Sequence, residues 1–598
     1  MFNQNKYTPK YLLSIIPEIF DIAKKSKTLD EFRRKIIEYV YNMQYEYFCD
    51  YESFSEGTII RVRDCAQVIN LIFNRRSEEK ADFSVAQAIF DIAYDKERPD
   101  LKPAFYADIL HIFIGLQGKG YRTRFADYHL IPSDMEGREA AIERSMQLDT
   151  LSEDVTKQTD KYSDGLSQES IERRKNRREY ICNAMQVSLF DWFNWRWQFE
   201  NVLKDIEKIE KLVKLSPNQT DAIIKAKKAK IPFGITPYYL SLMDYDYEEG
   251  RDRAIRAQVI PPETYVKQMS IYSQKERSCL DFMRETDTSP INLITRRYPS
   301  ICILKPFNTC PQICVYCQRN WEIDDVMTKT ALASEEQIDN ALKWIKNHPA
   351  IREVLITGGD PLGMPDSDFE RILAGVSGIP SVERIRIGTR TIVTAPMRIT
   401  DDLVDILAKY RIPGKRQIAV VTHVQHPYEL TIEMVNAVEK LRIRGISVFN
   451  QLVYTFFISR RFEAYLLRKN LAKIGIEPYY SFNTKGKDET VEYRVPIARL
   501  LQEQKEEARL LPGIDRTDEA VYNVPGMGKN YLRARQHHDL ISILPDGTRL
   551  YEFHPWEKNI TKNISTHIGN DVPILDYLCR LDAIGEDVYD YETIWYYF

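Results

Sequence analysis

The sequence has few cysteines and no long apolar run. Its 598 residues include nine cysteines, too sparse a set for the disulfide framework of a secreted protein. No stretch approaches the ~18 consecutive apolar residues of a membrane-spanning helix, and residues 1–6 lack the apolar core of a signal peptide. The formal net charge of −4 gives no general attraction to nucleic acid or to a membrane. We therefore expect a cytoplasmic protein that binds neither.

Three of the nine cysteines lie together in the chain. Cys310, Cys314 and Cys317 fall in the run Cys-Pro-Gln-Ile-Cys-Val-Tyr-Cys. Three thiolates at this spacing can bind three irons of a 4Fe–4S cluster and leave the fourth iron open to a small chelating ligand. The alternatives are a chance group of small buried residues and part of a zinc site, but zinc would need a fourth Cys or His at short range. The C-x3-C-x2-C spacing is similar to that of radical S-adenosylmethionine (SAM) enzymes, in which SAM fills the open site.

Composition and periodicity divide the chain into regions. They are a helical N-terminal domain of unknown role (1–145), a polar linker or solvated helix (146–180), a helical region (181–287), a region of alternating strands and helices (288–535), and a C-terminal hairpin and tail (536–598). The hairpin prediction rests on an Asp-Gly turn within residues 541–551. The basic run at 173–178 is flanked by acidic residues, and we expect a solvated helix face there rather than a phosphate contact.

The region 288–535 alternates short apolar runs with amphipathic helices. The predicted parallel strands are residues 300–304, 353–356, 384–387, 417–421, 447–451 and 477–482. This alternation indicates βα units, arranged either as a doubly wound sheet or as a full or partial barrel. In a barrel the chemistry lies at the carboxyl ends of the strands, and the cysteine run directly follows the first predicted strand.

Several further strings occur around the cysteines in a fixed order. They occupy residues 191–198, 235–242, 295–299, 358–362, 386–390, 422–423, 450–451 and 478–480. Together with the cysteines they resemble the lysine 2,3-aminomutase family of radical SAM enzymes, over roughly residues 185–545. The resemblance implies an α/β fold with a partial (βα)6-type radical SAM barrel and, in this chain, an α-helical N-terminal extension. It also implies three cofactors: a 4Fe–4S cluster, SAM and pyridoxal 5′-phosphate (PLP).

A PLP enzyme needs a lysine that forms a Schiff base with the cofactor aldehyde. The resemblance gives this role to Lys529, in the string Pro-Gly-Met-Gly-Lys, which taken alone would indicate only a turn with an exposed lysine. The family has a longer glycine run before this lysine; here one residue is missing and another is Met527. Arg297 resembles a ligand of the PLP phosphate, since a guanidinium fork suits phosphate. A second arginine of the lysine enzymes is Ile301 in this chain.

The resemblance also assigns residues to SAM and to the substrate carboxylate. The SAM set is Gly358, Gly359 and Asp360, at a backbone edge that holds the methionyl group, and Arg390, His423 and Gln451, at strand ends in or near the SAM site. A plain βα turn and a satisfied core histidine are the structural alternatives. Arg319 resembles the residue that binds the substrate α-carboxylate, and a surface arginine is the alternative.

Two positions bear on the choice of amino acid. Lysine-specific members carry an aspartate at each, where this chain has Lys485 and Asn523. A buried lysine facing a substrate ammonium would be strongly unfavourable, whereas Lys485 and Asn523 can both donate hydrogen bonds to a carboxylate. The pair resembles glutamate 2,3-aminomutases, so we expect the amino group of an acidic L-amino acid, with L-glutamate favoured, to move from C2 to C3. If the alignment slips by two positions to Lys487, Lys485 is a solvated loop residue.

Three other functions remain open at this point. The chain could be a lysine 2,3-aminomutase, an aminomutase for another or a protein-linked amino acid, or a non-catalytic binding or regulatory protein with the same fold. The complete set of cysteines, Arg319 and Lys529 disfavours the last. The expected partners are a small-molecule amino acid, an electron donor for the cluster and further copies of the chain in a homo-oligomer. Only Cys579 follows the cysteine run, and we expect no structural zinc.

Overall fold

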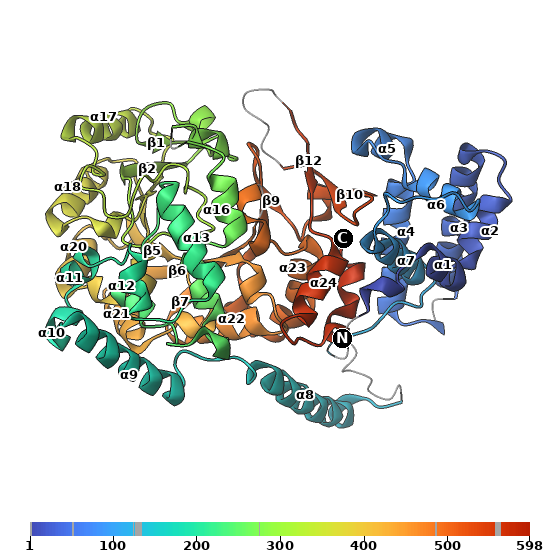
Figure 1. Cartoon of the computed structure of the whole chain (residues 1–598), viewed down its shortest axis with the longest axis horizontal. Helices are drawn as coiled ribbons and strands as arrows, with labels where there is room; N and C mark the ends of the chain where they lie inside the picture. Colours follow the sequence, from blue (N-terminus) through green and yellow to red (C-terminus); the bar gives the residue numbers. More distant parts are fainter. Residues whose placement is uncertain are drawn as a thin grey trace.

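The computed structural model describes residues 3–50, 53–123, 125, 134–273, 275–484, 487–555 and 564–598. Figure 1 shows an α/β part and a group of N-terminal helices on opposite sides of the C-terminal segment. Within the described residues, no helix is both long enough and apolar enough to cross a membrane.

One large sheet forms the centre of the α/β part (Figure 1). In the described residues its strands follow chain order: β1 (Ile294–Thr295), β2 (Ile301–Phe307), β3 (Glu353–Gly358), β4 (Arg384–Gly388), β5 (Gln417–Thr422), β6 (Ser447–Tyr454), β7 (Ile476–Asn483), β8 (Glu519–Val524) and β9 (Gly528–Tyr531). Strands β2 to β8 are parallel, and β1 and β9 pair antiparallel to the two ends. The end strands pair with one neighbour each, so the sheet is a partial barrel.

Helices connect the parallel strands as the sequence predicts. They are α17 (Glu335–Lys346), α18 (Asp366–Ser377), α20 (Asp401–Lys409), α21 (Ile432–Ile443) and α22 (Glu463–Lys473). Helix α17 begins with a capping box, in which Ser334 and Gln337 each bind the other's backbone N–H. Strand β5 is buried along nearly its whole length, as expected of a parallel strand covered on both faces.

All six predicted strands are confirmed, most of them with longer bounds, and β8 is a parallel strand that the sequence analysis missed. The connection from β7 to β8 explains this difference. It contains the short helix α23 (Ile497–Gln502) and several irregular turns instead of one amphipathic helix. The strand–helix alternation is therefore interrupted just before the strand that carries Asn523.

A second sheet is formed by β10 (His538–Ile543), β11 (Arg549–Phe553) and β12 (His567–Asn570). The predicted hairpin at 541–551 is confirmed as β10 and β11. Its Asp-Gly turn places Gly547 at a φ of 86°, a conformation that favours glycine. Helix α24 (Ile574–Asp582) and a 3-10 segment (Val588–Tyr596) follow this sheet.

The N-terminal helices pack against this C-terminal segment (Figure 1). They are α1 (Pro9–Ile15), α2 (Pro17–Lys24), α3 (Leu29–Cys49), α4 (Glu56–Ile72), α5 (Arg75–Ala81), α6 (Val85–Ala93) and α7 (Pro103–Leu116). Asp108 of α7 and Arg549 of β11 form a buried ion pair with 2.8 Å between charged atoms. The ring of His111 stacks on Trp595 with 4.5 Å between centroids. The two ends of the chain thus share one core.

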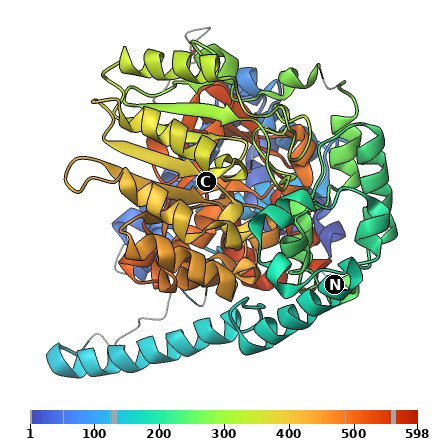
Figure 2. The same cartoon turned by 90° about the vertical axis from the view of Figure 1, so that its left-hand side faces the viewer.

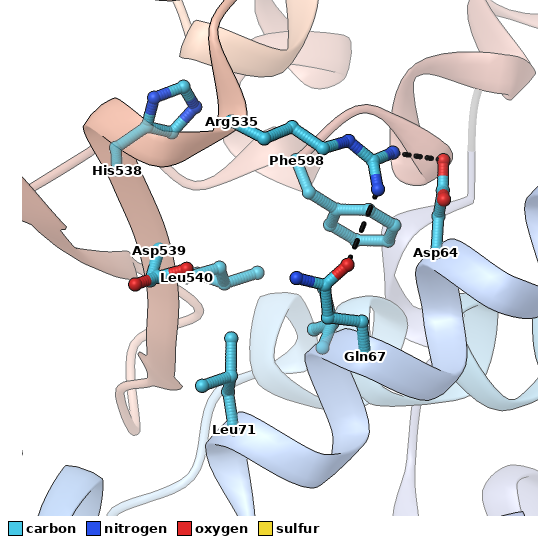
Figure 3. A pocket seen from close by; sticks show the side chains of 9 residues that line it. Asp64, Gln67, Leu71, Arg535, His538, Asp539, Leu540 and Phe598 are labelled. Carbon is cyan, nitrogen blue, oxygen red and sulfur yellow. Dashed lines mark hydrogen bonds and ion pairs between the residues drawn. The ribbon is translucent and has the colours of Figure 1, made fainter.

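A small pocket of about 30 Å³ lies where α4 meets β10 (Figure 3). Arg535 reaches across it to Asp64 and, at 3.3 Å, to the side-chain oxygen of Gln67. The C-terminal Phe598 also lines the pocket. Its volume suits ordered water rather than a ligand.

Helices α8 (Gly137–Thr159) and α9 (Gln168–Met185) occupy the stretch around the predicted linker, and α8 extends along the lower edge of Figure 2. The basic run of α9 is only in part the solvated face that we expected, since Lys175 is exposed but Arg177 is not. Arg177 is buried and donates to the carbonyl oxygens of Met243, at 2.9 Å, and Leu212, at 2.7 Å. Arg174 donates to the carbonyl of Leu430. These guanidinium groups satisfy backbone acceptors and attach α9 to the barrel and to the segment that precedes it.

The segment before the barrel consists of short helices. They are α10 (Leu189–Trp192), α11 (Trp195–Glu200), α12 (Ile206–Glu210), α13 (Pro217–Lys228), α14 (Pro237–Leu240), α15 (Arg253–Val259) and α16 (Glu263–Met269). Two backbone groups of this segment meet the cysteine loop directly, since Ile313 donates to the carbonyl of Gly234 at 3.2 Å and Val315 to that of Gln258 at 3.0 Å.

Candidate active site

The cysteine loop lies directly after β2, at the carboxyl end of the parallel strands. Its backbone is fixed at several points: Cys317 donates to the carbonyl of Cys314 at 3.1 Å, and Met327 donates to that of Cys310 at 3.2 Å. The three thiols are free and partly buried. The loop is therefore a preformed turn whose cysteines face the end of the barrel where chemistry is expected.

The three cysteines are the predicted ligands of a 4Fe–4S cluster. In the described residues, no three His, Cys, Asp or Glu side chains lie close enough together to hold one metal ion. In a 4Fe–4S cluster each cysteine binds a different iron, so the three thiols need not meet at one metal ion. Burial raises the pKa of the Cys310 and Cys317 thiols, and the neighbouring cysteines raise it further. Such thiols stay protonated until bound iron stabilises the thiolates.

Arg390 connects the cysteine loop to the neighbouring strands. Its Nη1 donates to the sulfur of Cys314 at 2.9 Å and its Nε donates to the carbonyl of His423 at 3.1 Å. Its Nη2 contacts Glu429 and the hydroxyl of Tyr239. Arg390 therefore supplies positive charge beside a predicted cluster ligand, and Glu429 and Tyr239 hold it in place.

Gly359 lets the end of β3 approach the cysteine loop. A Cβ at this position would lie 2.1 Å from the carbonyl oxygen of Thr309 and 2.5 Å from its nitrogen. The backbone N–H of Gly359 instead donates to Phe307, and that of Asp360 donates to Thr309, both at 2.9 Å. Gly358 has a φ of 122°, which also favours glycine. These residues thus align the predicted SAM edge with the loop that precedes Cys310.

The side chain of Asp360 accepts hydrogen bonds from other residues of the protein. Its buried carboxylate accepts from the hydroxyl of Thr389 at 2.7 Å, from that of Thr391 at 2.9 Å and from the backbone N–H of Arg390 at 2.9 Å. Burial raises the pKa of Asp360, and these hydrogen bonds oppose that rise. Asp360 therefore links the ends of β3 and β4, and only its backbone remains suitable for a ligand.

His423 directly follows β5 and meets Gln451, which lies inside β6 and not at a strand end as the sequence predicted. Nδ1 of His423 donates to the carbonyl of Gln451 at 3.0 Å, because a carbonyl can only accept. Burial and the charge of Arg390 lower the pKa of His423 to about 4. The ring is therefore neutral near pH 7, with Nε2 as an acceptor.

Lys529 lies on β9, opposite Asn523 on β8. The two residues are a cross-strand pair, so their side chains share one face of the hairpin. Nζ of Lys529 lies 3.1 Å from the hydroxyl of Tyr298 and 5.3 Å from the centroid of the Tyr480 ring. Gly526 and Gly528 take φ values of 67° and 86°, so the glycines before Lys529 are required by the turn.

Sequence reasoning gave no separate role to Tyr298 and Tyr480, although both lie in the strings that carry the resemblance. Tyr298 directly follows Arg297, whose guanidinium donates to the carbonyl of Met283. Tyr298, which contacts Lys529, thus connects the predicted Schiff-base lysine to the chain segment of the predicted phosphate ligand. Tyr298 could have been identified from the sequence because it directly follows Arg297.

Arg319 is buried in a network of charges that the sequence did not predict. It forms an ion pair with Glu285, with 3.0 Å between charged atoms, and lies 3.7 Å from Glu322. Lys305 of β2 lies 3.5 Å from Glu285 and 2.8 Å from Glu322. Arg319 is therefore buried, and the alternative that it is a surface arginine is wrong.

Lys485 lies outside the described residues. Lys487, two positions later, is buried, and its Nζ donates to the carbonyl of Cys317 at 2.9 Å and to the side-chain oxygen of Asn320 at 2.6 Å. It also forms an ion pair with Glu489 at 2.8 Å. This lysine therefore contacts the cysteine loop.

A partial barrel with three free cysteines in the loop after its first parallel strand is the arrangement of a radical SAM protein, and residues 304–458 match the model of the Radical SAM superfamily. The chain belongs to the KamA family. It is 42% identical to an uncharacterised KamA family protein of Methanocaldococcus jannaschii, over 98% of this chain and 97% of that protein.

Relatives named as aminomutases match a smaller part of the chain. The glutamate 2,3-aminomutase of Clostridioides difficile is 34% identical over 58% of this chain and 77% of its own length. The L-lysine 2,3-aminomutase of Clostridium subterminale is 32% identical over 52% of this chain and 71% of its own length. The predicted family is thus confirmed: the chain is a radical SAM aminomutase of the KamA family and an isomerase. Its superfamily implies a 4Fe–4S cluster and SAM.

Proposed function

We propose that the protein is a PLP-dependent 2,3-aminomutase that moves the amino group of an acidic L-amino acid, with L-glutamate favoured, from C2 to C3 to give a β-amino acid. The observation that carries this proposal is the position of Lys529. Its amine lies beside Tyr298 and Tyr480 and shares a hairpin face with Asn523. An amine in this aromatic setting suits a Schiff-base lysine, and the asparagine beside it can donate a hydrogen bond to a substrate carboxylate.

Each cofactor has a set of residues that would hold it. Cys310, Cys314 and Cys317 would bind the cluster, the backbone at 358–360 and the groups around His423 would bind SAM, and Lys529 with Arg297 would bind PLP. When bound, the cluster and SAM supply the radical that removes a substrate hydrogen, and PLP supplies the aldehyde that carries the migrating nitrogen.

The chain's own residues position the substrate and manage its charges. Arg319 would bind the α-carboxylate, because a guanidinium fork matches a carboxylate with two parallel hydrogen bonds. Asn523, together with Lys485, would bind the distal carboxylate. Lys529 would exchange a proton at Nζ when it releases and recovers the cofactor, and the hydroxyl of Tyr298, 3.1 Å away, is placed to stabilise that amine. The rings of Tyr298 and Tyr480 would exclude water from this region.

An anaerobic assay tests the proposal. The protein would be reconstituted with iron, sulfide, SAM, PLP and a reductant, and offered L-glutamate, L-aspartate or L-lysine separately, with products resolved by chiral chromatography. We expect β-glutamate from L-glutamate and no β-lysine. Lys529→Ala should lose both the product and the near-ultraviolet absorbance of the lysine-bound cofactor, whereas Lys473→Ala, an exposed lysine of α22, should retain both.

The other outcomes are equally informative. β-Lysine as the main product would show that the acidic pocket assignment is wrong, although the enzyme class would stand. Moving the amino group of aspartate from C2 to C3 gives aspartate again, with its two carboxylates exchanged, so an isotope label at C2 would be needed to detect that turnover. No product from any of the three amino acids, with all cofactors bound, would overturn the proposed substrate class.

A further inference from the structure

Lys487 follows β7 and points to the cysteine loop instead of to solvent. Its side chain is only 6% exposed. The ammonium contacts the carbonyl of Cys317 at 2.9 Å, the side-chain oxygen of Asn320 at 2.6 Å and the carboxylate of Glu489 at 2.8 Å. An ammonium has three N–H donors, and in the described residues each has an acceptor. Lys487 therefore has no donor to spare for a substrate carboxylate.

The acceptors of Lys487 are themselves fixed. The amide nitrogen of Asn320 donates to the hydroxyl of Tyr265 at 3.1 Å and to Glu489 at 3.3 Å. Asn320 and Glu489 are both buried. A buried ion pair costs desolvation energy and is often no more stabilising than apolar side chains of the same volume. A contribution to stability therefore explains the Lys487–Glu489 pair only weakly. The positioning of the residues that Lys487 contacts explains it better.

The turn that Lys487 holds carries two functional groups. Cys317 is a predicted cluster ligand, and Arg319 is the predicted ligand of the substrate carboxylate. The backbone N–H of Arg319 also donates to the sulfur of Cys317 at 3.3 Å. A displacement of this turn would therefore move a cluster ligand and a substrate ligand together.

We propose that Lys487 is a positioning residue that fastens the turn at 317–320 to the loop after β7, and so sets the cluster and the substrate carboxylate site in one fixed relation. The part of this proposal that concerns the substrate carboxylate rests on the proposed function. The part that concerns the cluster rests on the cysteine loop. The positive charge of Lys487 also lies next to the peptide of Cys317, where it favours an anionic cluster ligand.

The test uses anaerobically reconstituted full-length protein. Lys487→Met removes the ammonium and keeps an apolar stem of similar length, and Lys473→Met is the matched control on the exposed face of α22. Two quantities would be measured: the rate at which a ferrous chelator removes cluster iron, and the midpoint potential of the cluster from an EPR-monitored redox titration. Neither requires turnover.

We expect Lys487→Met to release iron about tenfold faster than the wild type, in line with the usual effect of a residue that orients a metal ligand. Its potential should be more negative, because a nearby positive charge no longer stabilises the reduced cluster. Asn320→Ala, which leaves the bond from Lys487 to Cys317 in place, should show a smaller acceleration and remains informative if Lys487→Met does not fold. The control should match the wild type in both measurements.

Iron release and potential equal to those of the wild type in both Lys487→Met and Asn320→Ala would overturn the inference and leave the proposed function intact. A wild-type protein that holds no cluster after reconstitution would overturn both. A change in iron release with no change in potential would overturn the electrostatic part and support the positioning part.

Discussion

Arg319 and Glu285 form a buried ion pair, with 3.0 Å between Nη2 and Oε1. The other oxygen of Glu285 lies 3.5 Å from Nζ of Lys305. Nη1 of Arg319 is buried and has no hydrogen-bond partner in the described part of the chain. Because Arg319 is also the proposed ligand of the substrate α-carboxylate, Glu285 and the substrate would compete for one guanidinium. Lys305 can retain Glu285 when the substrate binds.

Replacement of Glu285 by glutamine removes the competing charge and keeps the shape of the side chain. We expect the KM for the amino acid substrate to fall about 3- to 10-fold, with a smaller change in kcat, because the carboxylate site gains net positive charge. Steady-state kinetics of the reconstituted enzyme would measure both constants. Arg319→Met should act in the opposite direction and raise KM. A KM for Glu285→Gln at or above the wild-type value would show that Glu285 orients Arg319 and does not compete for its site.

Gly359 provides a second prediction, because the structure gives its substitution a definite steric cost. In Gly359→Ala the new methyl group would lie 2.1 Å from the carbonyl oxygen of Thr309, so the end of β3 and the start of the cysteine loop must separate. We expect a loss of about 1–3 kcal/mol in unfolding free energy and fewer irons bound per chain after reconstitution. Gly513→Ala is the matched control, since no atom in the described part of the chain lies within 4 Å of the place that its Cβ would take. Full iron binding by Gly359→Ala would show that the loop tolerates the displacement.

The parts of the fold that the sequence predicts are those that depend on local pattern. Continuous apolar runs such as β5 mark buried parallel strands, and the carboxyl ends of parallel strands meet at one edge, so the cysteine loop could be placed there. The contacts that organise the site join distant residues. Arg390 and Cys314 are 76 positions apart, and Lys487 and Cys317 are 170 apart. No periodicity specifies such pairs, and the charge of Lys487 gives no indication that it is buried.

The ion pair between Asp108 and Arg549 allows a test of how the two ends of the chain are joined. Both side chains are almost fully buried, and Arg549 also donates to the carbonyls of Trp595 and Tyr597. Arg549→Met leaves the Asp108 carboxylate without this partner, and we expect a loss of about 3–5 kcal/mol in unfolding free energy. Arg535→Met, which removes the exposed pair with Asp64, should cost less than about 1 kcal/mol. Chemical denaturation would measure both, and a cost below about 1 kcal/mol for Arg549→Met as well would show that the buried pair contributes little to stability.

His423 gives a prediction about pH. Burial lowers its pKa from an ordinary 6.5 to about 4, so the unfolded chain takes up a proton more readily than the folded one. The contribution of neutral His423 to the unfolding free energy is therefore complete above pH 6.5. It is lost progressively as the pH falls from there to about 4. The full loss corresponds to about 3 kcal/mol. We expect the difference in unfolding free energy between the wild type and His423→Gln to fall by about this amount over that interval, measured by denaturant titration of cluster-free protein. His111 and His538 are buried in both proteins, so their contributions cancel in the difference. A difference that does not vary with pH would show that His423 can be protonated in the folded protein without cost.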